Sequence, residues 1–530
     1  MNKTAYPSYN AVDYFIERHI KEQRAALPAV YELNRAPVSY RELNERVAQA
    51  GHYLLSLGVK PEQRVALLMP DCREFVYFFF AALKIGAVAV PLNTFVHPAQ
   101  LAECLRDSRA VVLVAHPRYT ETVIALKRDP TLQHLRVMSD AVRFTHWPDH
   151  LPSYPVDADS TAFWLYTSGT TGSPKGVEHR HASLQICAES YGAQILHMSA
   201  QDVCFSTSKL FFAYGLGNSV LFPFAAGAAC VLNPDAASAE VICAHLAKFK
   251  PTLFFSVPYL YNQWLKTPEV NAADFVSVRM CISAGEFLPE RLFHAWKARF
   301  AHCIYDGIGS TEALHIFCSN REDACRAGTS GVAVPGYELR LVDEHDRPVK
   351  RGQVGQLMVK GETLAKNYWN RYRSSKLAFH GEWLCTGDLY RVDCDGFYTF
   401  VGRMGDAFKS SGLWVSPVEI EQALLQHPLV AEAAVIAATT ADGLCGAKAF
   451  IVSSSTLVCI TSFQLAAQLH EFLKQRLSAY KLPHTIVVLE ALPKTATGKI
   501  ARAVLRTADR EEPIIPTTPG TDARQPNNIG

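Results

Sequence analysis

Apolar segments of two lengths alternate along the first part of the chain. The stretch RVALLMP (64–70) is a short apolar run and predicts a buried strand. The longer run 75–92 is interrupted by Lys84 and predicts a buried helix followed by a second strand. Residues 39–59 have apolar positions at helical spacing, with Ser39 as a candidate N-cap and Glu42 three residues later. This alternation is typical of an α/β domain with a largely parallel sheet.

The same pattern returns between residues 200 and 305 and predicts a second sheet. Its strand-like stretches are DVCFSTS, GAACVLN, TLFFSVP, MCISAG and HCIYDG. From about residue 331 the chain becomes rich in turns and short alternating strands, which favours a small antiparallel or β-barrel-like part. After GRMGDAFK (402–409) the pattern changes again, to short α+β elements that end near Arg506.

We therefore expect an α/β fold with a large and a small domain. The large N-terminal domain, residues 1–403, would hold two parallel-type α/β sheets and the small β-barrel-like part. The small α+β C-terminal domain would cover residues 404–508. Residues 509–530 are rich in Pro, Asn and Thr with few large apolar groups, and we expect them to be a disordered tail.

Composition and charge exclude several classes of protein. The 52 basic and 50 acidic residues give a net charge of +2, so there is no basic footprint for a nucleic acid. The 14 cysteines are scattered, without a CxxC pair or zinc spacing, and are expected to be reduced thiols in the cytoplasm. The N-terminus lacks the apolar region of a signal peptide, and the apolar part of 75–92 is too short to span a membrane.

The stretch YTSGTTGSPKG (166–176) is the strongest candidate for a phosphate-binding loop. A predicted strand, 161–166, precedes it, and the apolar positions that follow it have helical spacing. A strand, a loop rich in Gly and hydroxyl groups, and a helix can present backbone N–H groups to an anion. Pro174 before Lys175 and Gly176 after it exclude a Walker A loop, which needs Gly before the Lys and Ser or Thr after it. A flexible polar turn would not require so constrained a composition.

These residues resemble the T-S-G-T-T-G-x-P-K-G signature of the adenylate-forming superfamily. That superfamily contains acyl- and aryl-coenzyme A ligases, nonribosomal peptide adenylation domains and luciferases. The resemblance covers residues 10–506, with several motifs in the family's order. It implies that the loop binds the β- and γ-phosphates of ATP. The residues that match are Thr167, Ser168, Gly169, Thr170, Thr171, Gly172 and Lys175.

Two further motifs match the family's adenine and magnesium segments. In DGIGSTE (306–312) the resemblance implies that Glu312 binds Mg²⁺, as suits a hard oxygen ligand, and that Thr311 contacts the α-phosphate. Alone, Ser-Thr-Glu is more typical of a helix N-cap. SAGE (283–286) resembles the segment that lines the adenine and acyl sites. The adenine-side residues expected from both motifs are Gly285, Glu286, Asp306, Gly307 and Ile308, with Ile308 where many members carry an aromatic residue.

The remaining motifs lie near and beyond the predicted domain boundary. WLCTGDLY (383–390) resembles the ribose motif, in which Asp388 would accept from both ribose hydroxyls. Arg403 matches the arginine that contacts ribose and phosphate, and Gly405 stands where the family has a hinge Asp or Lys. Whether Gly405 or Asp406 is the hinge stays open. Lys499 in LPKTATGKIAR (492–502) matches the catalytic lysine, which the resemblance places in the catalytic set with Thr311 and Glu312.

The family's small domain is mobile and rotates between its two half-reactions. By resemblance, this rotation would withdraw Lys499 and bring the segment from Lys409 through Ser410 to Gly412 beside a channel for coenzyme A. Gly412 would allow the thiol chain to pass close to the backbone.

The acid-binding segments resemble those of benzoate–coenzyme A ligases. They are KLFFAYGLGN (209–218) and GSTEALHIF (309–317), and a bound ring is expected against Ala213, Tyr214, Gly309, Thr311, His315 and Ile316. His315 fits equally well as a structural histidine. No Asp or Glu occurs from Val203 to Pro234, which argues against an α-amino acid because its buried ammonium would lack a partner. Anthranilate, with a neutral aryl amine, remains compatible.

The sequence thus predicts an acid–thiol ligase that uses ATP, Mg²⁺ and coenzyme A. It would convert benzoate, anthranilate or another substituted benzoate into aryl-AMP and pyrophosphate, and then transfer the aryl group to coenzyme A with release of AMP. Two alternatives are a stand-alone enzyme that loads a separate carrier protein and a non-catalytic nucleotide-binding homologue. Neither a nucleic acid nor a membrane is expected as a partner, and the oligomeric state, monomer or homodimer, stays open.

Overall fold

The computed structural model describes residues 9–138, 141–168, 174–406, 408–410, 413–440, 445–454, 461–494 and 500–511. Its contacts divide the chain into two compact units. The first unit comprises Met1–Gln353, Leu357–Thr386 and Val392–Thr399, and the second comprises Val354–Gln356, Gly387–Arg391 and Phe400–Gly530. The predicted boundary between residues 403 and 404 stays a prediction, because short segments before residue 403 cluster with the second unit.

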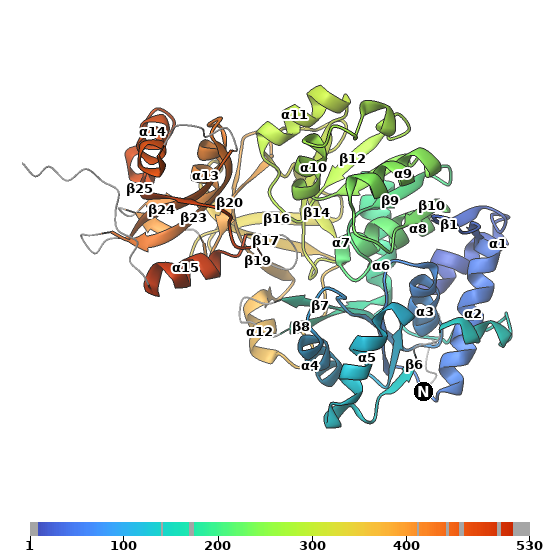
Figure 1. Ribbon diagram of the computed structural model, residues 1–530. Coiled ribbons are helices and arrows are strands. Elements are labelled where there is room, and N and C mark those ends of the chain that lie inside the picture. Colours follow the sequence, from blue (N-terminus) through green and yellow to red (C-terminus); the bar gives the residue numbers. More distant parts are fainter. Residues whose placement is uncertain are drawn as a thin grey trace, which may run out of the picture. The chain divides into compact units, whose positions relative to one another are not determined.

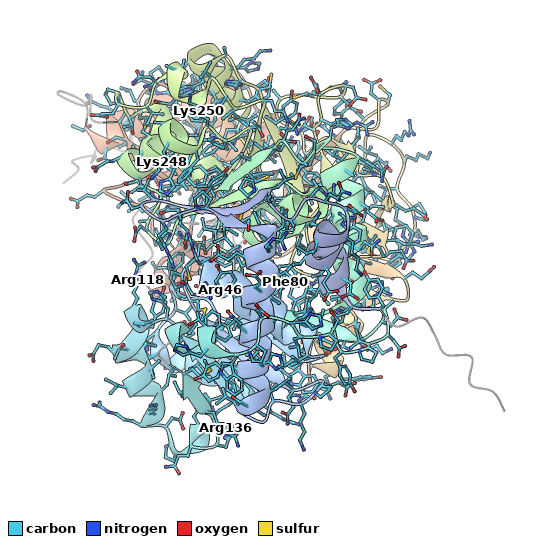
Figure 2. All side chains as sticks on the ribbon, turned by 90° about the vertical axis from the view of Figure 1, so that its right-hand side faces the viewer. Arg46, Phe80, Arg118, Arg136, Lys248 and Lys250 are labelled. Atoms are coloured by element: carbon cyan, nitrogen blue, oxygen red, sulfur yellow. The ribbon has the colours of Figure 1, made fainter. Side chains whose placement is uncertain are left out.

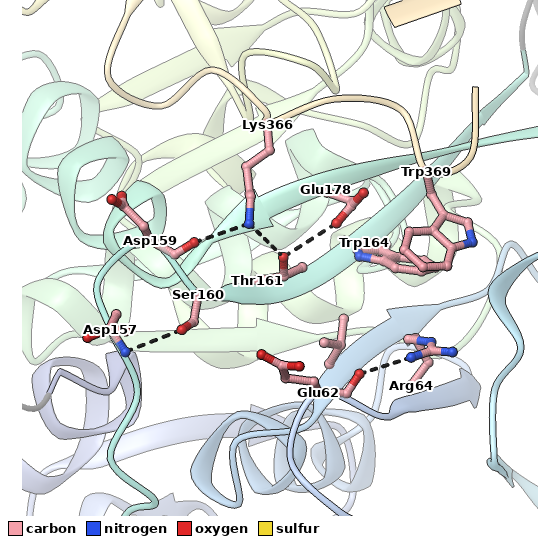
Figure 3. Close-up of a pocket in the computed structure, with 11 residues that line it drawn as sticks. Glu62, Arg64, Asp157, Asp159, Ser160, Thr161, Trp164, Glu178, Lys366 and Trp369 are labelled. Carbon is pink, nitrogen blue, oxygen red and sulfur yellow. Dashed lines mark hydrogen bonds between the residues drawn. The ribbon is translucent and has the colours of Figure 1, made fainter. Parts of the chain in front are cut away.

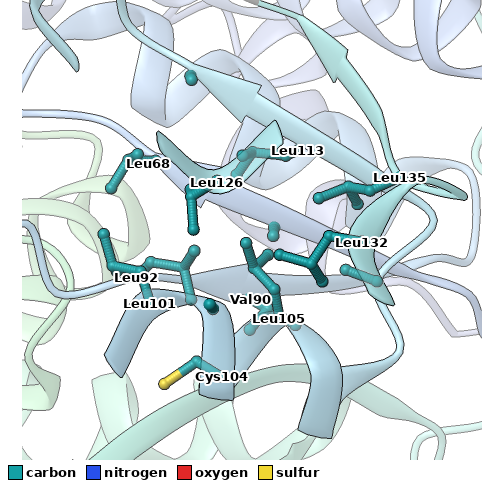
Figure 4. Close-up of a cluster of buried hydrophobic side chains, with 14 of the residues drawn as sticks. Leu68, Val90, Leu92, Leu101, Cys104, Leu105, Leu113, Leu126, Leu132 and Leu135 are labelled. Carbon is teal, nitrogen blue, oxygen red and sulfur yellow. The ribbon is translucent and has the colours of Figure 1, made fainter. Parts of the chain in front are cut away.

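A six-stranded sheet with parallel inner strands lies in the first unit (Figure 1). Its order is β6 (Arg136–Met138), β5 (Val112–Ala115), β3 (Arg64–Leu68), β4 (Val88–Pro91), β7 (Thr161–Ser168) and β8 (Pro174–Arg180). Strands β6 to β7 pair in parallel, whereas β8 pairs antiparallel to β7 at the edge. Leu68, Val90 and Leu105 belong to a buried cluster that joins this sheet to helix α4 (Pro98–Ser108) (Figure 4).

The nine-stranded sheet of the first unit is mixed. Its order is β15 (Val332–Ala333), β14 (Ile316–Ser319), β13 (Ile304–Gly309), β12 (Met280–Ser283), β11 (Leu253–Ser256), β9 (Val203–Ser206), β10 (Ala229–Leu232), β1 (Pro28–Glu32) and β2 (Val38–Ser39). The central strands from β13 to β1 are parallel, and the pairs β13–β14, β14–β15 and β1–β2 are antiparallel. The two parallel-type sheets predicted from the sequence are therefore confirmed.

Helices of the first unit cover these sheets. They are α1 (Arg18–Lys21), α2 (Tyr40–Ser56), α3 (Arg73–Lys84), α5 (Thr120–Lys127), α6 (His181–Cys187), α7 (Ala213–Leu216), α8 (Phe222–Ala226), α9 (Ala239–Phe249), α10 (Pro258–Leu265), α11 (Glu290–Phe300) and α12 (Tyr372–Ala378). Phe80 of α3 is fully buried, whereas Arg136 is exposed at the surface (Figure 2). No helix among the described residues is long and apolar enough to cross a membrane.

Most elements predicted from the apolar pattern are present. The run 64–70 contains β3, and the run 75–92 contains most of α3 and all of β4. Ser39 caps α2, since its hydroxyl accepts from the backbone N–H of Glu42 at 3.2 Å. These elements are specified locally, by apolar spacing and by a capping side chain.

The helix expected after the glycine-rich loop is present as α6 and the π-helical segment Ala188–Ala193, but an unpredicted strand precedes it. The chain first forms β8, which pairs with β7 residue by residue, and α6 begins only at His181. Gly176 and the β-branched Val177 disfavour a first helical turn, and β7 has an open edge that supplies hydrogen-bond partners. The described residues on either side of the loop are therefore antiparallel strands, and the helix begins one strand later.

A five-stranded sheet contributes residues to both units. It contains β16 (Tyr337–Val342), β17 (Val354–Gly361), β19 (Trp383–Val392) and β18 (Phe379–His380) in that order, with β20 (Tyr398–Arg403) beside β19. It occupies the region in which the sequence predicted a small β-rich part.

The second unit has its own α+β core. It contains β21 (Phe408–Ser410) paired with β22 (Leu413–Val415), and the sheet β23 (Val430–Thr439), β24 (Cys445–Ser453) and β25 (Pro483–Leu489). The helices α13 (Pro417–Leu425) and α14 (Ser462–Lys474) pack against that sheet. Helix α15 (Arg502–Glu511) includes residues 509–511, which the sequence assigned to the tail; Asp509 pairs with Lys448 and extends the helix. Residues 512–530 lie outside the described part.

Candidate active site

The β7–β8 hairpin holds both ends of the predicted phosphate loop. Thr167 pairs with Lys175 across the hairpin. The predicted residues Gly169, Thr170, Thr171 and Gly172 lie outside the described residues, as does the side chain of Ser168. Strand pairing therefore fixes the positions at which the chain enters and leaves the loop.

The turn between β13 and β14 carries Thr311 and Glu312, and two side chains connect it to this hairpin. The hydroxyl of Tyr368 donates to Glu312 Oε1 at 2.8 Å, and Lys175 Nζ lies 5.2 Å from the centroid of the same tyrosine ring. The ring of His179, on β8, donates from Nε2 to the carbonyl of Thr311 at 2.8 Å. The structure thus brings Lys175, Thr311 and Glu312 of two distant motifs into one region.

Neither Tyr368 nor His179 was identified from the sequence. Lys175, Val177 and His179 are every second residue of β8 and so share one face of the strand. This spacing would have been a signal only if β8 had been predicted as a strand. Burial lowers the pKa of His179 to about 4, so the ring is neutral at physiological pH. For Tyr368 the segment KNYWN offers no chemical pattern that distinguishes it from a core aromatic residue.

Glu312 offers one carboxylate for the predicted Mg²⁺. Among the described residues nothing donates to its second oxygen, Oε2, and no group of three His, Cys, Asp or Glu side chains could enclose a metal ion. Mg²⁺ in nucleotide sites is usually held by one or two carboxylates together with phosphate oxygens and water. A single carboxylate with an available oxygen fits that kind of site.

The predicted adenine segments are neighbours in the nine-stranded sheet. Ser283, the last residue of β12, pairs with Asp306 of β13, and Gly285 follows with φ of +89°. Asp306 is 5% exposed, its Oδ1 has no hydrogen-bond partner among the described residues, and burial raises the pKa of its carboxyl well above the usual range. A buried oxygen without a partner is costly. It therefore fits a ligand that donates a hydrogen bond, as the amino group of adenine does.

The other adenine-side residues are Glu286, Gly307 and Ile308. A Cβ at Gly307 would lie 2.8 Å from Ile316 Cγ2 and 2.9 Å from the carbonyl of Cys318, so this position requires glycine. Ile308 pairs with Cys318 and is partly exposed, while Glu286 follows Gly285 directly. The strand and the turn after β12 thus present these residues on neighbouring segments.

His315, one of the predicted acid-binding residues, is buried among aromatic side chains. His315 is 3% exposed, and its ring centroid lies 5.4 Å from that of Tyr214 and 4.6 Å from that of Phe222. Its Nε2 donates to Asn218 Oδ1 at 3.1 Å, and burial lowers its pKa to about 3. His315 is therefore a neutral member of an aromatic cluster that includes Phe222, which lies outside the predicted acid-binding segments.

The remaining acid-side residues are placed by the same elements. Ala213 begins α7, and the Tyr214 hydroxyl donates to the carbonyls of Ser256 and Ile282 at 3.3 and 3.2 Å. Gly309 pairs with Ile316 across the β13–β14 hairpin, and a Cβ at Gly309 would lie 2.5 Å from the carbonyl oxygen of His315. This contact explains why glycine is needed there.

In the second unit the predicted ribose residues form an ion pair. Arg403 Nε lies 2.7 Å from Asp388 Oδ1, and the N–H of Met404 donates to the carbonyl of Gly387 at 2.9 Å. Gly387 has φ of +73°, which glycine adopts without strain. Asp388 and Arg403 are thus held together, and their predicted contacts with the ribose and phosphate remain predictions.

The candidate hinge residues contact the last helix. Arg506 of α15 donates to the carbonyl of Gly405 at 3.1 Å and pairs with the carboxylate of Asp406. The backbone of Lys409 and Ser410 belongs to β21, but their side chains, Gly412 and Lys499 lie outside the described residues. The predicted roles of Lys409, Ser410, Gly412 and Lys499 therefore remain predictions.

A separate pocket of about 440 Å³ lies beside β8 (Figure 3). Its lining includes Arg64, Trp164, Glu178, Lys366 and Trp369, and none of the predicted site residues. Glu178 alternates along β8 with His179, so the two side chains point to opposite faces of the strand.

Comparison with known proteins identifies a matching family. Residues 16–369 match the model of the AMP-binding enzymes, and residues 419–499 match the C-terminal domain of AMP-binding enzymes. The chain is 41% identical over 508 residues to a 4-hydroxybenzoate–CoA/benzoate–CoA ligase of Rhodopseudomonas palustris, covering 94% of each chain. It is 40% identical to a benzoate–CoA ligase of Thauera aromatica, covering 94% of this chain and 96% of the relative.

The fold also matches a solved structure over almost its whole length. That structure is an anthranilate CoA ligase in complex with anthranoyl-AMP, with a TM-score of 0.89 and 38% sequence identity. The match covers 96% of this chain and 99% of the other.

Proposed function

Because this chain belongs to the family of AMP-binding enzymes, we propose that it is an ATP-dependent aryl–coenzyme A ligase acting on a benzoate-type acid. The carboxylate oxygen attacks the α-phosphorus of ATP, and pyrophosphate leaves. The sulfur of coenzyme A then attacks the acyl carbon of the aryl-AMP; AMP leaves and the thiol loses its proton. Activation is needed because a carboxylate has no good leaving group, whereas AMP is one.

One observation carries the ATP part of the proposal. Lys175 of the phosphate hairpin and Glu312 of the β13–β14 turn meet at the same tyrosine, Tyr368. A cationic group, a carboxylate and a loop rich in backbone N–H groups are the groups that bind a nucleotide triphosphate and its metal ion. When bound, Mg²⁺ neutralises phosphate charge. Thr311 would contact the α-phosphate, and Lys499 would bridge it to the attacking carboxylate.

The aromatic-acid part of the proposal is supported by the cluster around His315. Tyr214 and Phe222 pack against that ring, and Gly309 and Ile316 lie on the adjoining hairpin. Aromatic and aliphatic walls suit a flat apolar ring. We propose that the acid binds beside this cluster, and that Asp306 accepts a hydrogen bond from the adenine amino group of ATP.

We propose that residues of the second unit bind the ribose of ATP and the thiol of coenzyme A. Asp388 would accept from the ribose hydroxyls, with Arg403 held beside it by their ion pair. Residues 405–406 would form the hinge, and the segment from Lys409 to Gly412 would line the path of the pantetheine thiol. A cytoplasmic location is proposed because the cysteines are scattered and lack the spacing of a disulfide framework.

The experiment is a substrate panel. Purified protein is incubated with ATP, Mg²⁺ and benzoate, 4-hydroxybenzoate, anthranilate, phenylalanine or hexanoate, with and without coenzyme A. Pyrophosphate, AMP and thioester are measured separately. We expect pyrophosphate with at least one benzoate, thioester only with coenzyme A, and neither with phenylalanine.

Two outcomes would favour the alternatives. Pyrophosphate release without any coenzyme A thioester would favour loading of a carrier protein. The absence of nucleotide turnover with every benzoate would favour a non-catalytic nucleotide-binding protein.

A further inference from the structure

The segment 365–369 connects the phosphate hairpin to the turn that carries Glu312. On one side, the N–H of Ala365 donates to the carbonyl of Glu312 at 2.7 Å. On the other side it pairs with β8 through three backbone hydrogen bonds, namely Lys366 N to Glu178 O, Glu178 N to Asn367 O, and Trp369 N to Gly176 O, at 2.9, 3.2 and 2.8 Å. The segment therefore has a fixed position relative to both parts of the candidate site.

Tyr368 is the residue of this segment that points toward the site. The residue is 8% exposed and packs in a small cluster with Val177 and Ala365, and its ring centroid lies 5.6 Å from that of Phe379. A side chain packed on several sides has little rotational freedom left to lose when a ligand binds. Packing thus aims the hydroxyl of Tyr368 in one direction.

The two functional contacts of Tyr368 come from different atoms. Its hydroxyl donates to Glu312 Oε1 at 2.8 Å, a hydrogen bond strengthened by the negative charge of the acceptor. Its ring lies 5.2 Å from Lys175 Nζ, within the range of cation–π attraction. One side chain therefore contacts a candidate metal ligand through its hydroxyl and a candidate phosphate ligand through its ring.

We propose that Tyr368 is a positioning residue for nucleotide binding. Its hydroxyl holds one oxygen of Glu312 so that the other oxygen faces the metal-bound phosphates, and its ring keeps Lys175 beside them. This inference rests on the proposed function and adds a residue to it. Partners that orient the ligands of a metal ion often affect metal affinity strongly when they are removed.

The test separates the hydroxyl from the ring. Tyr368→Phe removes the hydrogen bond to Glu312 and keeps both the packing and the contact with Lys175. Binding of ATP is measured by isothermal titration calorimetry, once with Mg²⁺ and once with a chelator of divalent cations. We expect Tyr368→Phe to weaken ATP binding about tenfold with Mg²⁺ and to leave binding in the chelator unchanged.

Tyr40→Phe is the matched control. Tyr40 is fully buried, and its hydroxyl donates to the carbonyl of Ala228 at 2.7 Å, far in sequence from the predicted motifs. It should lose a comparable buried hydrogen bond without changing the effect of Mg²⁺ on ATP binding. A second variant, Glu312→Gln, tests the route of the effect, because adding Tyr368→Phe to it should cause little further weakening.

Three results would overturn the inference. The first is Mg²⁺-dependent ATP binding by Tyr368→Phe equal to that of the wild type. The second is weakening of equal size with and without Mg²⁺, which would indicate a structural role alone. The third is full additivity of Tyr368→Phe and Glu312→Gln. A wild-type chain that binds no ATP would overturn the proposed function, and this inference with it.

Discussion

At the scale of single residues, His179 joins segments that are 132 positions apart in the sequence. Its neutral ring donates to the Thr311 carbonyl at 2.8 Å and stacks on Phe163, with centroids 5.1 Å apart. Thr311 is the residue proposed to contact the α-phosphate. A displaced carbonyl would move that hydroxyl, so the position of His179 bears on the chemical step.

We expect His179→Leu to reduce kcat/KM for pyrophosphate formation about tenfold, because the Thr311 carbonyl loses its donor, a change of about 1.4 kcal/mol. His179→Gln carries an amide N–H near the place of Nε2 and should recover most of the activity. Steady-state kinetics with varied ATP would measure both variants. Equal losses in the two variants would show that ring packing, and not the hydrogen bond, is what matters.

At the scale of elements, the π-helical segment Gly217–Leu221 and the β13–β14 hairpin meet at His315. A Cβ at Gly217 would lie 2.4 Å from Cδ2 and 2.8 Å from Nε2 of that ring. Leu314, just before it, has φ of +71°, so the turn already holds a strained backbone conformation. Little space is therefore available for His315 to move within its cluster.

Gly217→Ala should thus push His315 toward the proposed acid site. We expect the KM for the aromatic acid to rise about tenfold while the KM for ATP stays within about twofold, since the hairpin itself is kept. Kinetics with each substrate varied in turn give the comparison. A parallel rise of both KM values would point to general unfolding of the site instead.

Among these elements, the sequence predicted those that local signals specify. The spacing around 64–92 and the cap at Ser39 predicted β3, α3, β4 and the start of α2, because those signals are local. The edge strand β8 was not predicted, since its stability depends on pairing with β7. Motif residues such as Lys175 and Glu312 were proposed from the sequence, and the structure places both against Tyr368. Tyr368 was not proposed, because its role depends on a contact with a residue 56 positions away.

At the scale of the whole molecule, several buried histidines are kept neutral. His181 has no exposed surface, its Nδ1 accepts from the N–H of Ala11 at 3.2 Å, and burial lowers its pKa to about 4. Protonation of Nδ1 would replace an acceptor by a second donor. Asp71 has the opposite effect on the pH dependence of stability. Burial raises the pKa of its carboxyl to about 6, so its contribution to stability falls as pH rises.

Because burial depresses the pKa of His181, this residue makes the folded protein less stable as pH falls. Between its unfolded pKa of about 6.5 and its folded pKa of about 4 the unfolded chain binds more protons, so stability is lost as pH falls. From pH 7 to pH 5 this site contributes a loss of about 2 kcal/mol. His181→Asn, which keeps an acceptor near Ala11, should therefore lose about 2 kcal/mol less than the wild type over that interval.

Urea unfolding at the two pH values measures this difference. The wild type and the variant share all other titrating groups, Asp71 included, so their effects cancel in the comparison. Identical losses for the two proteins would contradict the account of a neutral, desolvated His181.

The central claim is that the carboxylate oxygen of an aromatic acid becomes bonded to the α-phosphorus of ATP. The most direct test uses a benzoate that the substrate panel shows to be accepted, labelled with ¹⁸O in both carboxyl oxygens. After turnover, the AMP is analysed by mass spectrometry. The account predicts AMP that carries one ¹⁸O, because thiol attack at the acyl carbon leaves the bridging oxygen on phosphorus. Unlabelled AMP, or ADP as the nucleotide product, would contradict it.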